Sequence, residues 1–358
     1  MEACLCGILT MKLGGRSYLI GGGAGFIGIH LSKSLIEQGA SVTIVDDFSA
    51  AALSLSDLVA LLPTARIIQE NLATYEHTGN LNVIFHLASA VGPVGVMSHA
   101  AKIGADTLAT TLSTIEIAKR YAARLVYVST SEVYGTSGVH AEENKCVFFS
   151  PFSARQEYAL AKRLAETIIQ NSLTYSNKPF SYQIVRPFNV TGPFQDPKKG
   201  FVAPRFVLQA LNDLPLTIYG SGDQIRAFSH ISDICDGLIE IAHSKAHNEV
   251  WNIGNSLNTI PIIDLAKKII TTVGKGSIIH LDPQTIHGAG FHEANDKIPN
   301  ASKALSRLNW HPQHDANFVI SSVVDYWKKN NLFRIHKHWL EEELAPISFA
   351  SRRMGALA

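Results

Sequence analysis

A tyrosine and a lysine four residues apart form the first pair whose types and spacing suit chemistry. Tyr158 and Lys162 stand at positions i and i+4 of an amphipathic segment, so a helix places the phenol and the ammonium on one face. A nearby cation stabilises a phenolate and lowers the pKa of the phenol. We therefore expect Tyr158 to act as a base toward a substrate hydroxyl near neutral pH.

Hydroxyl and carboxyl side chains follow a short apolar segment upstream of that pair. Leu125–Val128 has the composition of a strand and continues into Ser129, Thr130, Ser131 and Glu132. The carboxyl ends of parallel strands form the edge at which α/β sheets bind ligands. We expect these side chains to meet the tyrosine at that edge.

A run of glycines marks a second site. Gly21–Gly28 (GGGAGFIG) follows the apolar Tyr18–Ile20 and precedes the amphipathic Ile29–Gln38. Glycine lets the chain turn sharply and approach a pyrophosphate, and the N-terminus of the next helix offers amide donors and a positive dipole. The motif predicts a dinucleotide site formed by Gly22, Gly25, Phe26, Ile27 and Gly28.

An acid at the end of the next strand specifies the dinucleotide. The apolar Val42–Val45 ends in Asp46 and Asp47. A carboxylate there accepts hydrogen bonds from both ribose hydroxyls and repels a 2′-phosphate, which favours NAD over NADP. We assign that role to Asp46, which comes first after the strand, and expect Asp47 to be a solvated or capping neighbour.

Short apolar segments alternate with amphipathic ones through the first half of the chain. The expected strands are Tyr18–Ile20, Val42–Val45, Ile67–Ile68, Val83–Leu87, Leu125–Val128 and Ile184–Val185, and the clearest helices are 106–122 and 158–172. This order predicts an α/β protein with a Rossmann doubly wound parallel sheet and right-handed crossovers.

The pattern changes near Asn189, where loops rich in Pro and Gly separate shorter helices. A smaller mixed α/β substrate domain is expected at the C-terminal side of that point. The predicted divisions are a leader (1–15), the NAD-binding Rossmann domain (16–188), a part that mainly binds substrate and returns some segments to the Rossmann sheet (189–330), and a peripheral helix with a loose tail (331–358).

Composition excludes several classes of protein. The 358 residues hold 31 Lys and Arg against 30 Asp and Glu, a net charge of +1, which argues against a nucleic-acid partner. No apolar stretch approaches the roughly 20 residues that cross a bilayer, so we expect no membrane span. Four scattered cysteines suit a reducing cytoplasm, and the histidines lack metal-ligand spacing, so no metal is expected.

The motifs together resemble the extended short-chain dehydrogenase/reductases that act on nucleotide sugars. This NAD-dependent epimerase/dehydratase group contains UDP-glucose 4-epimerase, UDP-glucuronate decarboxylase and dTDP-glucose 4,6-dehydratase. The resemblance spans about residues 16–330 and rests on six ordered motifs: Gly21–Gly28, His86–Ala88, Ser129–Gly135, the pair Tyr158 and Lys162, Arg186–Pro193, and Tyr219–Arg226.

The resemblance implies a role for each matching residue. Tyr158 would be the base on the sugar 4-hydroxyl, Lys162 would tune it and hold the nicotinamide ribose, and Thr130 would donate to the same oxygen. A hydride would pass from sugar C4 to NAD, giving a 4-keto intermediate. Further residues would bind cofactor (Asn71, Leu87, Ala88, Pro187) or the substrate diphosphate (Asn189, Arg226).

The fate of the 4-keto sugar depends on the neighbours of Thr130. Ser131 stands where 4,6-dehydratases carry an aspartic acid, and a hydroxyl is a poor general acid. The Thr-Ser-Glu triplet and Arg155 are similar to UDP-glucuronate decarboxylases, yet Lys297 replaces an expected arginine, a point charge instead of a fork.

We therefore expect 4-epimerisation of a nucleotide sugar, most simply a UDP-sugar, as the main activity. The alternatives are a UDP-glucuronate-type decarboxylase or a 4,6-dehydratase, with Ser131, Glu132, Arg155 and Lys297 as further site residues. A third possibility is an NAD-binding regulator that has lost turnover. The family resemblance also implies a homodimer formed through the helices expected at 106–122 and 158–172.

Overall fold

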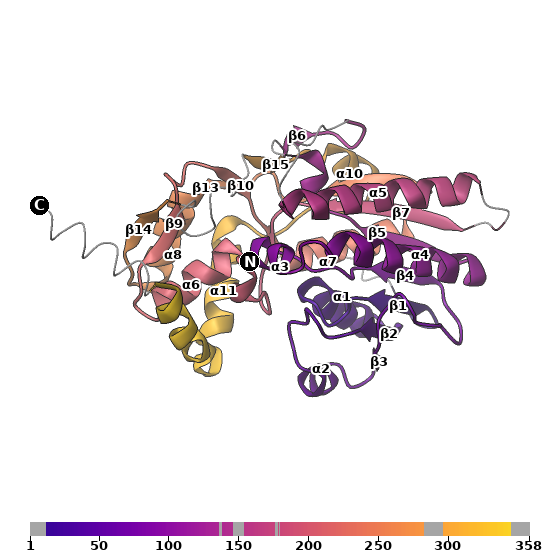
Figure 1. Ribbon diagram of the computed structural model, residues 1–358, viewed down its shortest axis with the longest axis horizontal. Coiled ribbons are helices and arrows are strands. Elements are labelled where there is room, and N and C mark those ends of the chain that lie inside the picture. The colour runs from indigo at the N-terminus through magenta and orange to yellow at the C-terminus, as the bar shows by residue number, and fades with distance from the viewer. Residues whose placement is uncertain are drawn as a thin grey trace, which may run out of the picture.

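A seven-stranded parallel sheet forms the framework of the protein (Figure 1). The computed structural model describes residues 12–135, 138–145, 154–175, 178, 180–282 and 296–344. The strand order is β12-β7-β5-β4-β1-β2-β3. The strands are β1 (Ser17–Gly21), β2 (Ser41–Asp46), β3 (Arg66–Gln69), β4 (Val83–His86), β5 (Arg124–Val128), β7 (Ser181–Pro187) and β12 (Glu249–Ile253).

Helices cover both faces of this sheet, which is why its central strands are mostly apolar. Residues of α1 (Phe26–Glu37) and α7 (Ile231–His243) share one apolar core with one face. Residues of α4 (Ile103–Tyr121) and α5 (Ala154–Thr174) share another core with the opposite face. The predicted doubly wound Rossmann architecture is confirmed.

A second group of elements packs around its own apolar core, beyond the carboxyl ends of the strands (Figure 1). That core is built from α6 (Val202–Leu211), α8 (Ile262–Val273), α11 (Ala316–Lys328) and β9 (Leu216–Tyr219). The other strands are β6 (Gly138–Ala141), β8 (Val190–Thr191), β10 (Ile225–Ala227), β11 (Ser229–His230), β13 (Thr259–Pro261), β14 (Ile278–Leu281) and β15 (Lys297–Pro299).

The described chain also contains several short helices. They are α2 (Leu55–Leu61), α3 (Pro93–Ser98), η1 (Ser131–Tyr134), η2 (Pro197–Lys199), α10 (Ser302–Arg307) and η3 (Lys329–His336). Strands β13, β10, β15 and β6 form one sheet, and β14 pairs with β9 in another. Within the described ranges, no helix combines the length and apolar composition that crossing a membrane requires.

Two side chains near the ends of the described chain are buried in the body of the protein. Leu13, from the expected leader, is 1% exposed, and its N–H donates to the Gln38 carbonyl at 2.9 Å. Leu340, from the expected peripheral tail, is fully buried in the core of α6, α8 and α11. Each apolar side chain leaves water by packing on a distant element. Residues 1–11 and 345–358 lie outside the described residues.

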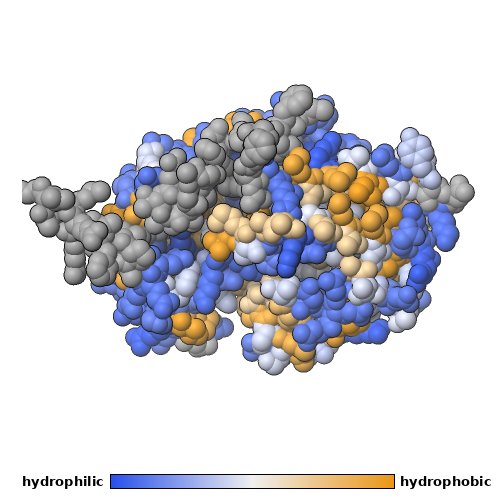
Figure 2. All heavy atoms as spheres, viewed as in Figure 1, coloured by the Kyte–Doolittle hydropathy of each residue, from blue (hydrophilic) through white to orange (hydrophobic). Residues whose placement is uncertain are grey.

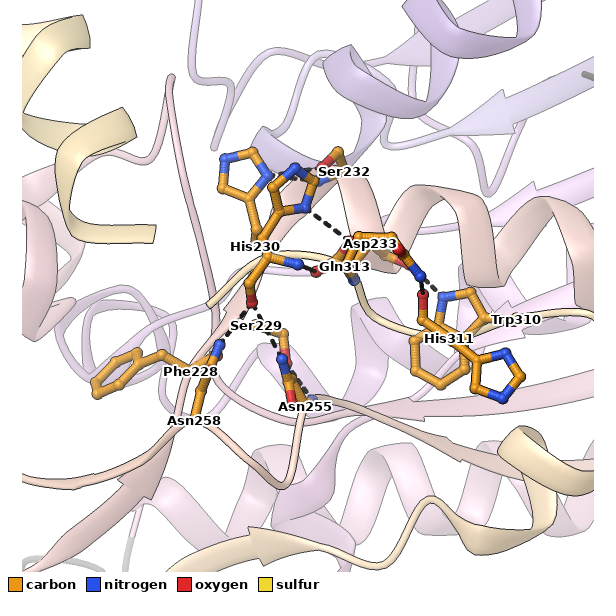
Figure 3. Close-up of polar contacts among 11 residues, drawn as sticks. Phe228, Ser229, His230, Ser232, Asp233, Asn255, Asn258, Trp310, His311 and Gln313 are labelled. Atoms are coloured by element: carbon orange, nitrogen blue, oxygen red, sulfur yellow. Dashed lines mark hydrogen bonds and ion pairs between the residues drawn. The ribbon is translucent and has the colours of Figure 1, made fainter. Parts of the chain in front are cut away.

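A polar network at the start of α7 fixes the segment that leads to the site (Figure 3). Asp233 accepts hydrogen bonds from the backbone N–H groups of Gln313 and His314 at 3.0 and 3.2 Å. The Ser229 hydroxyl accepts from the N–H of Asn255 at 2.8 Å, and the Ser229 N–H donates to the Asn189 carbonyl at 3.1 Å. The network thereby fixes the backbone of Asn189.

Candidate active site

A cavity of about 550 Å³ opens at the carboxyl ends of the sheet strands. The loops after β1, β2, β4, β5 and β7 line one side, and residues of α6, β9, β10 and β15 line the other. The sheet thus contributes its loops, and the second group of elements covers them. A cleft of this kind at the strand ends is where α/β folds bind ligands.

The glycine loop after β1 has the conformation that its glycines predict. Gly22 has a φ of +80°, and a Cβ there would lie 2.5 Å from the backbone nitrogen of Ala88. A Cβ on Gly28 would lie 2.5 Å from the Cα of Gly23. Gly25 is the N-cap of α1 and has no side chain to bond its free N–H groups. The loop therefore leaves backbone donors open toward the cavity, as a pyrophosphate requires.

Asp46 links the loop after β2 to the glycine loop. Its Oδ2 accepts from the N–H of Ala24 at 2.9 Å, and its Oδ1 accepts from the N–H of Phe48 at 2.8 Å. Burial raises the pKa of Asp46, while these two N–H donors oppose the rise. Asp47 lies apart and caps the turn through Ser49. Each carboxylate oxygen of Asp46 keeps a lone pair for a ribose hydroxyl, so the residues fit an NAD dinucleotide.

Tyr158, Thr130 and Lys162 meet in the same cavity. The Thr130 side chain is hydrogen-bonded to the phenol of Tyr158, and Thr130 Oγ1 also accepts from the N–H of Glu132 at 3.2 Å. Tyr158 is 7% exposed and Lys162 is 1% exposed. A hydroxyl, a phenol and an ammonium from β5 and α5 are thus assembled at one edge of the sheet.

The expectation that Lys162 lowers the pKa of Tyr158 is wrong for this structure. Burial raises the pKa of Tyr158, the hydrogen bond with Thr130 opposes the rise, and the charge of Glu132 adds to it. Lys162 Nζ donates to the Val128 carbonyl at 3.0 Å and lies 4.8 Å from the centre of the Tyr127 ring. Its ammonium is directed at the sheet, because the helix spacing fixes a shared face and not the direction of a side chain.

A buried ion pair lies one helical turn beyond Lys162. Glu166 accepts from Arg186 Nε at 2.9 Å and from Arg186 Nη2 at 2.6 Å. Burial would raise the pKa of Glu166, but the two Arg186 bonds lower it overall. Burial lowers the pKa of Lys162 to about 7, and the charge of Glu166 opposes that change. Arg186 therefore holds the Glu166 carboxylate, a negative charge, in place near the lysine.

Two cations line the cavity from neighbouring strands. Arg226 on β10 stands opposite Lys297 on β15 in the strand register. Lys297 is 3% exposed and donates to the carboxylate of Glu132, and Arg226 is 7% exposed. Ser131, between Thr130 and Glu132, is also buried against the cavity.

Asn189 has a bracing contact in addition to its place in the cavity wall. Its Nδ2 donates to the carbonyls of Ala227 at 3.3 Å and Lys297 at 3.4 Å. Its φ of +31° is one that asparagine tolerates better than most residues. The side chain thus connects the strands that carry the two cations.

The cavity collects nearly the whole set of predicted site residues. Along it lie Gly22, Gly25, Phe26, Ile27, Gly28, Asp46, Asn71, Leu87, Ala88, Thr130, Ser131, Glu132, Tyr158, Lys162, Pro187, Asn189, Arg226 and Lys297. The side chain of Arg155 lies outside the described residues. Sequence reasoning missed Lys199 and Arg205, which also line the cavity, and Glu166 of the buried ion pair. The sequence did contain a sign of Glu166, because it follows Lys162 by one helical turn and so shares a face of the helix with it. No local pattern marks the other two.

Comparison with known proteins agrees with this geometry. The family model described as "NAD dependent epimerase/dehydratase family" matches residues 18–254. UDP-glucuronic acid decarboxylase 1 of Xenopus tropicalis is 32% identical over 88% of this chain and 72% of its own length. The UDP-N-acetyl-alpha-D-glucosaminuronate decarboxylase of Bacillus cytotoxicus is 31% identical over 87% of this chain and 97% of its own.

Solved structures share the fold over most of the chain. The UDP-glucose 4-epimerase of Thermotoga maritima, solved with UDP-glucose, has a TM-score of 0.76 and 24% identity, covering 88% of this chain and 100% of its own. The UDP-glucuronic acid 4-epimerase of Bacillus cereus, in complex with UDP-glucuronic acid and NAD, has a TM-score of 0.75 and 24% identity with the same coverage. At these identities the likeness describes the fold alone.

Proposed function

The chain belongs to the NAD-dependent epimerase/dehydratase family, and from that premise we propose that it decarboxylates a UDP-linked hexuronic acid. It is an enzyme, its cofactor is NAD, and its substrates are nucleotide sugars. Two relatives that span most of the chain are named as decarboxylases of such acids, one of them with an N-acetyl group on the sugar. They favour our alternative expectation over 4-epimerisation.

The observation that carries this proposal is that two cations, Arg226 and Lys297, line the same cavity as the candidate base Tyr158. A UDP-hexuronate brings a diphosphate and a C6 carboxylate, and both need cationic partners. We assign Arg226 to the diphosphate, because its planar fork bonds phosphate oxygens in pairs, and Lys297 to the carboxylate. The ammonium of Lys297 exchanges its bond with Glu132 for one with the substrate.

In its phenolate form, Tyr158 would begin the reaction by taking the proton of the sugar 4-hydroxyl, with Thr130, its hydrogen-bond partner, donating to the same oxygen. NAD, when bound, would accept the C4 hydride and would supply a positive charge that favours the phenolate form of the tyrosine. The sugar becomes a β-keto acid, whose C5–C6 bond breaks so that carbon dioxide leaves and the electron pair enters the C4–C5 enolate. We assign Glu132 to take a proton from solvent and deliver it to C5. Return of the hydride to C4 and of the Tyr158 proton to the oxygen restores the hydroxyl.

One observation favours 4-epimerisation as a second candidate. Lys297 is already paired with Glu132, so this part of the cavity wall presents a neutral pair to the substrate. A neutral pair suits the C6 hydroxymethyl group of an uncharged hexose as well as it suits a carboxylate. In that case Tyr158 and Thr130 keep their roles. The 4-keto sugar would rotate in the cavity, so that the hydride returns to its opposite face.

Mass spectrometry after separation of isomers tests the proposal. The purified protein is incubated with NAD and, separately, with UDP-glucuronate, its 2-acetamido analogue UDP-N-acetylglucosaminuronate, and UDP-glucose. Loss of carbon dioxide from either acid supports decarboxylation. A new isomer of unchanged mass, from the acid or the hexose, establishes an epimerase instead and overturns the proposal. Loss of water from the hexose identifies a dehydratase.

A further inference from the structure

A lysine from the second group of elements reaches the loop that follows β2. Lys199, at the end of η2, donates a hydrogen bond from Nζ to the carbonyl of Ala50. The same loop is bonded to the glycine loop, because the N–H of Ala52 donates to the Ala24 carbonyl at 2.9 Å. Asp46 bonds that Ala24 as well. Lys199 is therefore connected to both loops that form the dinucleotide site.

The backbone around Lys199 is held firmly in this place. A Cβ on Gly92, just before α3, would overlap the carbonyl oxygen of Lys199. The carboxylate of Asp196 accepts from the N–H of Lys198 at 2.9 Å and caps η2. Gly200 follows with a φ of +83°, which ends the turn. The close packing and the cap fix the direction in which the Lys199 side chain leaves the backbone.

Lys199 also contributes charge to the ribose end of the cavity. Lys199 and Asp46 both line the cavity and interact electrostatically. Burial lowers the pKa of Lys199, while the carboxylates of Asp196 and Asp46 oppose that change. The loop segment 48–53 reads FSAAAL and carries no charged residue. A cation from η2, far along the chain from β2, therefore reaches Asp46, the acid expected to bind the ribose.

We propose that Lys199 is a cofactor-specificity residue, whose ammonium beside Asp46 offsets the repulsion between that carboxylate and a 2′-phosphate. Asp46 alone rejects NADP, because two like charges would meet in a partly buried site. Lys199 attracts the 2′-phosphate of NADP and so weakens the rejection of NADP by Asp46. The inference concerns the cofactor site and holds whichever sugar is converted.

A purely structural role for Lys199 predicts a different result. If the side chain only braces η2 against the loop after β2, its loss weakens NAD and NADP binding by the same factor. If its charge offsets Asp46, its loss weakens NADP binding much more than NAD binding. The ratio of the two dissociation constants separates these roles.

Calorimetric titration of the full-length protein with NAD and with NADP, without any sugar nucleotide, measures that ratio. Lys199→Gln removes the charge and keeps a donor for the Ala50 carbonyl. We expect the ratio of the NADP to the NAD dissociation constant to rise about tenfold, with the NAD constant changing by less than about threefold. Lys199→Arg keeps the charge and should leave the ratio within about twofold of the original.

Lys198→Gln is the matched control, since it makes the same charge change one residue away. Lys198 is exposed, and its Nζ lies 6.0 Å from the centre of the Trp339 ring. The ratio of the NADP to the NAD dissociation constant should be the same in Lys198→Gln as in the unaltered protein. Equal weakening of both cofactors in Lys199→Gln, an unchanged ratio, or a ratio raised equally in Lys199→Arg would overturn the proposal. Thermal melting of each variant establishes that it is folded before titration.

Discussion

The Lys297 ammonium donates a hydrogen bond to the Glu132 carboxylate, so a strand near the end of the chain supplies the partner of an acid that follows β5. Lys297 is 3% exposed and the Glu132 side chain is 22% exposed. Removing one member of such a pair leaves a buried charge without its partner. This bond therefore affects both stability and the chemistry at sugar C5 and C6.

Glu132→Gln should block formation of the protonated, decarboxylated sugar nucleotide while leaving the first oxidation possible. The amide still bonds Lys297 but cannot deliver a proton to C5, so we expect formation of this product to fall about 100-fold or more. Absorbance of reduced cofactor in a single turnover reports the oxidation, and mass spectrometry reports the protonated, decarboxylated product. Parallel loss of both signals would remove Glu132 from the protonation step.

Tyr158→Phe should abolish conversion of any sugar nucleotide. Without the phenol no group takes the 4-hydroxyl proton, and a general base of this kind contributes about 100- to 10,000-fold. Calorimetry should show NAD and substrate binding within a few-fold of the original, because the ring remains. Full activity of this variant would refute the mechanism.

Glu166→Gln should destabilise the protein strongly. Arg186 would keep its buried charge without an anion, a change that costs about 3 to 5 kcal/mol in comparable pairs. Arg163→Ala is the control: Arg163 bonds the same Glu166 at 2.7 Å, but its side chain is 43% exposed, so we expect a loss below about 1 kcal/mol. Urea unfolding measures both free energies, and equal losses would contradict the assignment.

Acid should destabilise the protein through its buried histidines. Burial, aided by the charge of His314, lowers the pKa of His230 from 6.5 to about 4. Between these values the unfolded chain binds more protons than the folded chain, so stability is complete above pH 6.5 and is lost as pH falls toward 4. We expect His230 to contribute a loss on the order of 1 to 2 kcal/mol by about pH 5.

His230→Asn isolates this effect. His230 caps α7 by accepting from the N–H of Ser232 (Figure 3), and asparagine is a favoured N-cap that does not titrate. Melting temperatures across the pH range should show a shallower acid slope in the variant. The variant should keep part of the dependence of melting temperature on pH, because burial also lowers the pKa values of His86 and His243. An unchanged slope would mean that His230 does not contribute.

An apolar surface on α4 and α5 should mediate a homodimer. Leu112, Leu160 and Leu164 are 51%, 48% and 47% exposed, and apolar atoms gather over these helices in Figure 2. Leu160 and Leu164 share one helical face, and apolar patches of this kind commonly mark interfaces. We expect light scattering to give twice the chain mass of 38.9 kDa.

Leu164→Asp should shift that protein to the monomer mass by placing a charge in the interface. Leu257→Asp, which alters an 89% exposed leucine in the loop after β12, should leave the dimer intact. A monomer mass for the unaltered protein would disprove this assembly.

Local pattern was sufficient to predict the family, and it selected residues that the structure brings together in one cavity. The motifs predicted an NAD-dependent nucleotide-sugar enzyme, and this expectation is confirmed. The glycine loop and Asp46 lie in one cavity with Tyr158 and Lys162, because parallel strands place their carboxyl ends at one edge. The main expectation of 4-epimerisation has less support than decarboxylation, since the motifs around Thr130 serve several reactions of the family.

The features that sequence reasoning missed depend on distant contacts. Nothing near Lys199 indicates that it bonds Ala50, and nothing near Leu13 or Leu340 indicates which core each side chain enters. The direction of the Tyr158 pKa shift follows from burial, which the spacing of Tyr158 and Lys162 does not reveal. Helix faces can be predicted from periodicity, whereas the environment of a side chain requires the whole fold.

The position of β12 at the edge of the large sheet has a consequence during synthesis of the chain. β7 pairs with β12 residue by residue from Gln183 with Glu249 to Pro187 with Ile253. A nascent chain that ends before β12 leaves β7 as an open, apolar edge, which is a template for pairing with other chains. We therefore expect ribosome-bound chains of this length to need chaperone protection, and premature termination there to yield aggregates in place of a shortened dinucleotide-binding protein.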